Sequence, residues 1–291
     1  MKKPLLSKYL NERALAIGTL LTVMIPLTAM SEELTGRAII DRYMETLDAD
    51  SELAYIRMKT YIPDGLHSIV KEHRFLALMR KNGKGKRSYM MRMIRPVSVE
   101  GVTLLAIEGG GGTEQFSYLP DIGYVTRISP DSRSGAFLGS DFTYEDLLRE
   151  VPGNFRYERQ PDQVVHGVEC YALRAYPESE APPSYYLYRD LYIEKEAFTV
   201  SKIDFYTSGD KPVKTFDAYE YNSPEVSGET LRPRHAVLAD LEKNTMTVMN
   251  VVEGRLNTDL DPKLFTPDAI VELTPVDLRN LIFTQGFTVT D

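Results

Sequence analysis

The feature that most constrains the fold is a long series of short, strand-like segments that runs from Ala54 to Val252. Turn residues such as Asn82-Gly83 and Ser208-Gly209-Asp210 separate these segments. Strands joined by short turns favour an antiparallel meander, whereas a doubly wound parallel sheet would need a helix between successive strands. The predicted strands are 54–62, 68–80, 86–95, 102–108, 115–119, 124–128, 154–160, 163–176, 185–193, 199–206, 213–221, 230–240 and 244–252.

Three segments outside these strands carry helical signals. The first follows Thr35, a good N-cap, and has one apolar stripe at helical spacing, formed by Ile40, Tyr43, Met44 and Leu47. Thr143 starts a pattern typical of a capping box, which predicts a short helix near Glu145. Thr274-Pro275 predicts the start of a C-terminal helix, because proline suits the first helical position.

Several strands are apolar on both faces, although a strand with one wet face should alternate between apolar and polar residues. In the segment 75–79 every residue is apolar, and the segments 89–94 and 245–252 also place apolar side chains on both faces. There are too few helical residues to cover both faces. A half-open barrel would leave a concave apolar surface for a ligand, and an ordinary two-layer core is the alternative.

Methionine and tyrosine are abundant, with 11 and 18 residues. Methionine adapts to irregular apolar ligands, and tyrosine offers an apolar ring with a polar tip at a wet rim. A shift of one residue in strand register would exchange the two faces. The side chains predicted to line a lipid-binding cavity are Met79, Tyr89, Met91, Met93, Leu105, Phe116 and Tyr118.

The N-terminus has the anatomy of a secretory signal peptide. Basic residues precede an apolar run from Ala14 to Met30, and small residues allow cleavage after Ser31. We therefore expect a signal peptide at residues 1–31 and one domain at residues 32–291, with a retained membrane anchor as the alternative. The lone Cys170 excludes an intramolecular disulfide and is expected to be buried.

No pattern of residues favours an enzyme or a metal site. The chain lacks a Gly-x-Ser-x-Gly elbow, a His-Glu-x-x-His helix and a phosphate loop, and we expect no cofactor. His67 and His73 would lie on one face of a regular strand, where they could bind a metal, but a solvated strand face explains them better. The net charge of −8 argues against nucleic acid as a partner. A basic hairpin from Lys81 to Arg87 is either a solvated loop or a contact for lipid headgroups or an exporter.

One stretch of the sequence carries a family resemblance. Phe137-Leu138-Gly139-Ser140-Asp141-Phe142-Thr143-Tyr144-Glu145-Asp146, with Tyr118-Leu119-Pro120 before it and Leu264-Phe265-Thr266 after it, closely resembles the LolA-like family of outer-membrane lipoprotein-sorting proteins. The similarity spans residues 34–271. The sequence departs from the family pattern in having no tryptophan.

The resemblance implies a fold and a role. Proteins of this family have a mainly β fold, an antiparallel unclosed half-barrel with helices covering the concave side, and carry lipid or lipoprotein acyl chains in the periplasm. The expected protein is a monomeric carrier that acts with an inner-membrane lipid exporter and an outer-membrane acceptor. A periplasmic sensor that detects lipid or peptide and controls a membrane partner is the alternative.

Within the resembling stretch, the residues are expected to be structural rather than a gate. Gly135 and Gly139 permit backbone geometry that other residues resist. The remaining members can pack a loop onto the sheet or cap its turn. The motif residues to which this structural role is assigned are Phe137, Gly139, Ser140, Asp141, Phe142, Tyr144 and Asp146.

Overall fold

The computed structural model describes residues 33–62, 68–110, 112–221 and 230–287. The predicted signal peptide, His67 and the ends of some predicted loops lie outside these residues. Residues from Leu34 onward form one compact unit. Among the described residues, no helix is both long and apolar enough to cross a membrane.

The described chain contains thirteen strands and a small number of short helices. Every predicted strand is present, with bounds shifted by a few residues. The strands are β1 (Ser51–Ile62), β2 (Ser68–Lys81), β3 (Arg87–Arg95), β4 (Thr103–Gly109), β5 (Gly112–Tyr118), β6 (Val125–Ile128), β7 (Phe155–Val165), β8 (Val168–Pro177), β9 (Tyr188–Glu194), β10 (Val200–Tyr206), β11 (Lys214–Tyr221), β12 (Pro233–Asp240) and β13 (Thr245–Leu256). The helices are α1 (Gly36–Thr46), α3 (Ala269–Glu272) and α4 (Pro275–Thr284), with 3-10 turns at Val97–Val99, Pro130–Ser132, Pro152–Asn154 and Pro262–Phe265.

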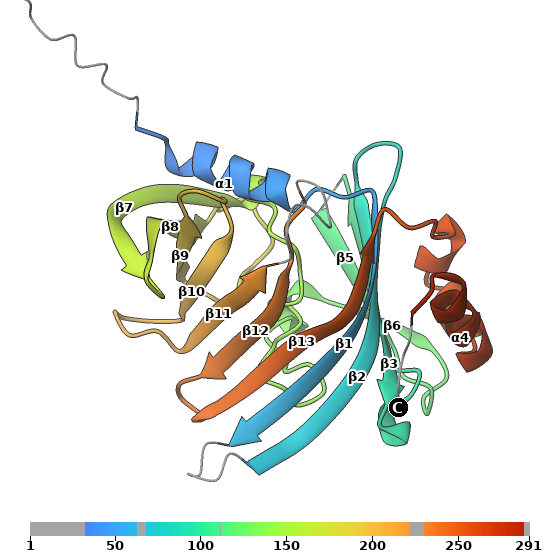
Figure 1. Cartoon of the computed structure of the whole chain (residues 1–291). Coiled ribbons are helices and arrows are strands. Elements are labelled where there is room, and N and C mark those ends of the chain that lie inside the picture. The colour runs from blue at the N-terminus through green and yellow to red at the C-terminus, as the bar shows by residue number, and fades with distance from the viewer. Residues whose placement is uncertain (1–32, 63–67, 111, 222–229, 288–291) are drawn as a thin grey trace, which may run out of the picture. The chain divides into compact units, whose positions relative to one another are not determined.

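All thirteen strands belong to one antiparallel sheet (Figure 1). The strand order is β6-β5-β4-β3-β2-β1-β13-β12-β11-β10-β9-β8-β7. The first and last strands of the chain therefore meet in the middle of the sheet, and the two edge strands, β6 and β7, follow each other in the sequence. The sheet curls but β6 does not pair with β7, so the barrel stays open. The predicted antiparallel half-barrel is confirmed.

Helix α1 covers the concave side of the half formed by β7 to β11. The side chain of Thr35 caps this helix by accepting a hydrogen bond from the Ala38 amide at 3.2 Å. Ile39 and Ile40 are fully buried and pack with inward-facing residues of β8 and β9, including Leu173 and Leu191. The apolar stripe predicted from the sequence thus faces the sheet.

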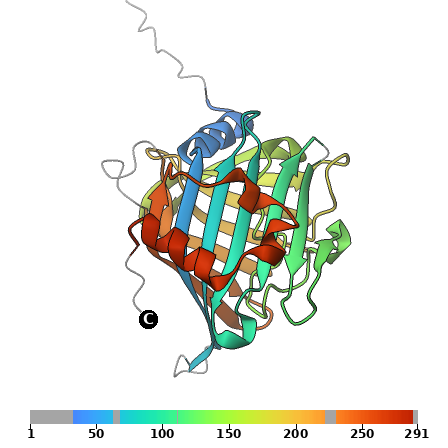
Figure 2. The ribbon, with the colours of Figure 1, turned by 90° about the vertical axis from the view of Figure 1, so that its right-hand side faces the viewer.

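We call residues 260–287 the C-terminal segment. It covers the opposite, convex face of β1 to β5 (Figure 2). This placement differs from the expectation that helices would cover only the concave side. The apolar residues on the convex face of these strands pack against the C-terminal segment. The buried members from the sheet and the C-terminal segment are Leu53, Tyr55, Leu76, Leu78, Met90, Leu105, Leu260, Phe265, Ile270, Leu278 and Phe287.

A buried arginine fixes the C-terminal segment to the sheet. Arg92, on the convex face of β3, donates to the carbonyl oxygens of Ile270 at 2.8 Å and Leu273 at 2.6 Å. It also donates to the Thr103 hydroxyl at 2.9 Å. These carbonyls belong to the last turn of α3, where backbone acceptors lack intrahelical partners. Burial lowers the pKa of Arg92.

The short helix predicted near Glu145 is absent. The capping pattern does form, because the Thr143 amide donates to the Asp146 carboxylate at 2.7 Å and the Asp146 amide donates to the Thr143 hydroxyl at 3.2 Å. Only turns follow it. By contrast, Thr274 caps α4 through a reciprocal hydrogen-bond pair with Asp277, as the sequence predicts.

Two neighbouring residues of α3 test the role of the convex-face cover. Ile270 is fully buried, whereas Val271 is 40% exposed. Ile270→Ala should lower the free energy of unfolding by about 2 to 4 kcal/mol, since it leaves a cavity against the sheet. Val271→Ala should change it by less than about 0.5 kcal/mol. Urea denaturation of both variants checks this, and equal effects would show that the segment does not pack as described.

Candidate functional site inside the half-barrel

The concave face of the sheet is mainly apolar and rich in flexible side chains. Met58 of β1, Phe75 of β2, Met93 of β3 and Leu104 of β4 point into it from one half. Phe205, Val213 and Leu238 approach from the other half. Side chains from both halves of the curled sheet therefore enclose one interior, and that interior is the candidate site.

A single irregular stretch fills this interior. We call residues 133–148 the interior segment; it lies on the connection between the two edge strands, β6 and β7. Phe137 and Phe142 are 2% and 3% exposed and pack among the inward-facing residues of the sheet. Leu138, Tyr144 and Leu147 pack beside them. The family-motif stretch therefore lies inside the half-barrel, and its expected packing onto the sheet is observed.

The interior segment folds back on itself. The Phe137 amide donates to the Phe142 carbonyl at 2.7 Å, and the Tyr144 amide donates to the Gly135 carbonyl at 3.1 Å. The turn between them needs Gly139, which has a φ of +67°. The segment is thus a small hairpin with its own hydrogen bonds and little regular pairing to the sheet.

Asp141 attaches the tip of this hairpin to the middle of the sheet. Its carboxylate accepts hydrogen bonds from the hydroxyls of Thr247, at 2.7 Å, and Thr245. Thr247 is fully buried and is also hydrogen-bonded to Thr60 of β1 at 3.0 Å. Strand β13 therefore presents two hydroxyl groups on the concave face that match one carboxylate of the interior segment, and Thr60 of β1 is hydrogen-bonded to one of them.

A buried ion pair forms a second attachment. The ammonium group of Lys214, on β11, lies 3.1 Å from the Asp146 carboxylate and donates to the Asp141 carbonyl at 2.7 Å. The Tyr186 hydroxyl donates to the other oxygen of Asp146 at 2.7 Å. Burial raises the pKa of Tyr186, and the neighbouring Asp146 charge adds to this. The carboxylate is thus fully partnered in a dry site, as buried charges must be.

Further polar contacts hold the remainder of the interior segment. Gln115 of β5 donates to the Tyr144 carbonyl at 2.8 Å. Arg133 donates to the Thr113 carbonyl at 2.5 Å, and Lys71 donates to the Gly139 carbonyl at 3.3 Å. In each of these contacts a side chain donates to a backbone carbonyl. Specific hydrogen bonds therefore hold the segment around its apolar side chains.

The seven side chains predicted to line a cavity do not share one face. Met79, Tyr89, Met91 and Met93 point to the concave side, because they pair in register with Tyr89, Ala106, Leu104 and Phe75 respectively, all inward-facing. Leu105, Phe116 and Tyr118 lie on the convex side beneath the C-terminal segment. For these last three, the predicted shared face is wrong. The role in lipid binding proposed for the first four stays a prediction.

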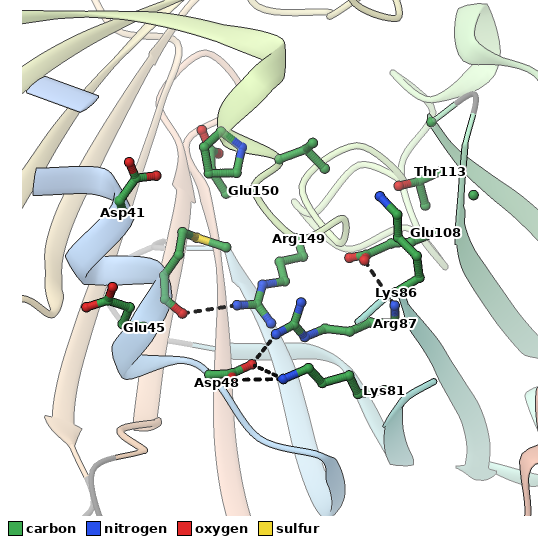
Figure 3. A pocket seen from close by; sticks show the side chains of 15 residues that line it. Asp41, Glu45, Asp48, Lys81, Lys86, Arg87, Glu108, Thr113, Arg149 and Glu150 are labelled. Atoms are coloured by element: carbon green, nitrogen blue, oxygen red, sulfur yellow. Dashed lines mark hydrogen bonds and ion pairs between the residues drawn. The ribbon is translucent and has the colours of Figure 1, made fainter. Parts of the chain in front are cut away.

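A cavity of about 410 Å³ opens at the α1 end of the interior (Figure 3). Its wall combines residues of α1, the β2–β3 hairpin, the β4–β5 hairpin and the chain at Arg149–Pro152. None of the seven predicted side chains lines it. Charged side chains dominate the wall, and those labelled in Figure 3 are Asp41, Glu45, Asp48, Lys81, Lys86, Arg87, Glu108, Arg149 and Glu150.

The basic hairpin predicted from the sequence contributes to this wall. Lys81 lies 2.9 Å from Asp48, and Arg87 also forms an ion pair with Asp48. Both Lys84 and Lys86 are exposed, but only Lys86 lines the cavity. The hairpin is therefore only partly a solvated loop.

Other residues singled out from the sequence have structural partners. Cys170 is buried, as expected, and burial raises the pKa of its thiol. His166 lies 2.8 Å from Asp217, and His235 lies 2.5 Å from Asn250. Among the residues that the structure describes, no group of three or more acidic, histidine or cysteine side chains could hold a metal ion.

The sequence analysis missed the polar residues of the concave face. Lys214, Thr247, Gln115 and Tyr186 hold the interior segment, yet none stands in a recognisable motif. The available signal was weak: a polar residue in a strand is ordinarily assigned to the wet face. Only the folded structure reveals that these four reach the interior segment: the register of the sheet places Lys214, Thr247 and Gln115, and Tyr186 lies just before β9.

The Asp146–Lys214 pair offers a test of the attachment. Asp146→Asn should lower the free energy of unfolding by about 3 to 5 kcal/mol, because the Lys214 charge would remain buried without a counter-ion. Glu158→Gln removes one member of an exposed ion pair with Arg156 and should leave stability unchanged. Denaturant titration compares them. An Asp146→Asn variant as stable as the control would mean that this contact does not hold the interior segment.

Comparisons with known proteins agree with this architecture. A family model described as that of an uncharacterized protein matches residues 85–272. No curated protein sequence matches the chain. A domain from Vibrio parahaemolyticus that carries the name outer membrane lipoprotein-sorting protein has a TM-score of 0.72 at 20% identity, covering 81% of this chain and 98% of that one.

Two further solved structures share the fold. A DUF1329 family protein from Desulfovibrio piger gives a TM-score of 0.74 at 19% identity and covers 81% of this chain and 97% of its own. A LolA superfamily protein from Nitrosomonas europaea gives 0.63 at 20% identity, with 81% and 99% covered. The chain shares the open half-barrel fold of these structures, and it belongs to the family whose model matches residues 85–272.

Proposed function

We propose that this protein is a periplasmic carrier that holds the acyl chains of a lipid or lipoprotein inside its half-barrel. The observation that supports this is the filling of the interior. An unclosed sheet presents a continuous apolar concave face, and an irregular hairpin rather than a second sheet covers it. Such a hairpin can leave without disturbing the pairing of any strand.

The energetics allow an acyl chain to take the place of the interior segment. Exposing Phe137 and Phe142 would cost about 3 kcal/mol each. A lipid chain of about 16 carbons would regain about 0.8 kcal/mol for each methylene that it buries, roughly 12 kcal/mol in all. The cargo therefore offsets the lost packing and leaves a margin for its own entropy loss.

Methionines on the concave face suit this exchange. Met58, Met91, Met93 and Met249 belong to the interior cluster. Because their side chains are unbranched and polarisable, they can pack against rigid phenylalanine rings in one state and against a flexible chain in another. The four concave-side residues predicted from the sequence fit such a surface.

The setting is inferred from the N-terminus and from the relatives. The basic and apolar leader supports removal of residues 1–31 on secretion, which would leave one domain from residue 32. The shared fold with a lipoprotein-sorting domain and a LolA superfamily protein supports lipid or lipoprotein as cargo. We further propose transport towards the outer membrane, with an inner-membrane exporter as donor and no chemical step.

Purification of the secreted protein followed by native mass spectrometry and lipid extraction tests the proposal. The expected result is a co-purifying phospholipid, fatty acid or acylated species. A protein that arrives empty and also fails to take up a fluorescent fatty acid would contradict the carrier function. In that case a sensor that docks a peptide or protein would be the better account.

Two adjacent methionines provide matched variants. Met91 points to the concave side, while Met90 is buried on the convex side under the C-terminal segment. Met91→Gln should weaken fatty-acid uptake about tenfold, because it places a polar amide on the proposed binding face. Met90→Gln should reduce stability but leave the affinity of the folded protein unchanged. The reverse pattern would place the ligand on the convex face.

A further inference from the structure

The charged cavity at the α1 end is not explained by a carrier that recognises acyl chains alone. We propose that this cavity binds the phosphate of an anionic lipid headgroup, with Arg149 and Lys86 as the cationic ligands. This inference rests on the carrier function proposed above and adds the class of lipid. It is carried by two cations of the wall, Arg149 and Lys86, that pair with none of its carboxylates, and by the position of the cavity.

Most acids of the wall are already paired. Glu150 accepts two hydrogen bonds from Arg189, at 2.9 and 3.1 Å, and Asp48 is shared by Lys81 and Arg87. Glu108 accepts from the Arg87 amide at 3.0 Å. Asp41 lies 2.8 Å from Arg37. Among the described residues, Glu45 and Glu108 form no ion pair, so neither of them neutralises Arg149 or Lys86.

Arg149 and Lys86 are the cations that remain. Among the described residues neither forms an ion pair with a carboxylate. Arg149 donates from one terminal nitrogen to the Met44 carbonyl at 3.2 Å and is also hydrogen-bonded to Tyr89, while its Nε is buried with no acceptor. The guanidinium therefore keeps several N–H donors for a ligand, in the fork geometry that suits phosphate. Figure 3 shows it between α1 and the β2–β3 hairpin.

The cavity lies where the apolar concave face ends. Tyr89, on that face beside Met79 and Ala106, donates its hydroxyl to Glu108 in the cavity wall at 3.3 Å. Burial raises the pKa of Tyr89, and the nearby Arg149 charge opposes this. A ligand with its chain along Met79 and Met91 would thus bring its headgroup to Arg149. An amphipathic anion fits both parts.

The experiment compares two lipids with identical acyl chains, phosphatidylglycerol and diacylglycerol, of which only the first has a phosphate, using the full protein purified from the periplasm. Inorganic phosphate serves as a probe for a free anion. Native mass spectrometry or fluorescence displacement gives the affinities. We expect phosphatidylglycerol to bind about tenfold more tightly than diacylglycerol, since the charge-assisted hydrogen bonds to the phosphate are lost with the neutral lipid.

Variants assign the preference to the two cations. Arg149→Gln keeps an amide donor for the Met44 carbonyl but removes the charge, so it should abolish the preference and leave diacylglycerol binding unchanged. Arg149→Lys should retain part of the preference. Lys86→Gln should reduce it severalfold, and Lys84→Gln, which changes a lysine of the same hairpin that does not line the cavity, should have no effect. Unchanged diacylglycerol binding also shows that each variant is folded.

Each contrary outcome has a distinct meaning. Equal binding of both lipids, unaffected by Arg149→Gln, would overturn the headgroup site while the carrier function stands. Tight binding of inorganic phosphate that phosphatidylglycerol cannot displace would overturn the lipid as source of the anion. Failure of both lipids to bind would overturn the carrier function and the headgroup site together.

Discussion

The need to keep both faces of one open sheet away from water governs the structure. Strands β1 to β4 carry large apolar residues on both sides, and an unclosed barrel cannot bury both by curling alone. The chain solves this with its two irregular parts. The C-terminal segment shields the convex face from water, and the interior segment and α1 shield the concave face. The C-terminal segment is held by Arg92 and a large apolar cluster, whereas the interior segment is held by hydrogen bonds and an ion pair to polar side chains of the sheet.

This difference in attachment gives the two covers different properties. The ion pair of Lys214 with Asp146 contributes little net stability compared with well-packed apolar residues, but it specifies one position. The hydroxyls of Thr245 and Thr247 act in the same way on Asp141. If the interior segment leaves, these groups can regain water at the open end, whereas the segment's phenylalanines must be replaced by other apolar matter. A lipid chain meets that requirement.

Sequence patterns predicted the strands, their antiparallel order and the capped helices, because alternation, turn residues and caps are local signals. The faces could not be predicted, because they depend on register. Opposite Tyr55 and Ile56 of β1, strand β13 has one extra residue, Val252, and this bulge changes the alternation of β13. In β5 the concave side is polar, with Gln115 and Ser117, so choosing the apolar Phe116 and Tyr118 selected the wrong face. The inward orientation of polar residues such as Lys214 could not be predicted either, because their partners lie far away in the sequence.

We propose that bound cargo takes the place of the interior segment. Hydrogen exchange measured with and without bound lipid tests this most directly. The amides of Phe137 and Tyr144, which are hydrogen-bonded within the segment, should lose protection when lipid binds, while amides in the centre of β1, β2 and β13 should keep theirs. Full protection of these two amides in a protein shown to hold lipid would contradict the account, because the segment and the acyl chain would then occupy different places.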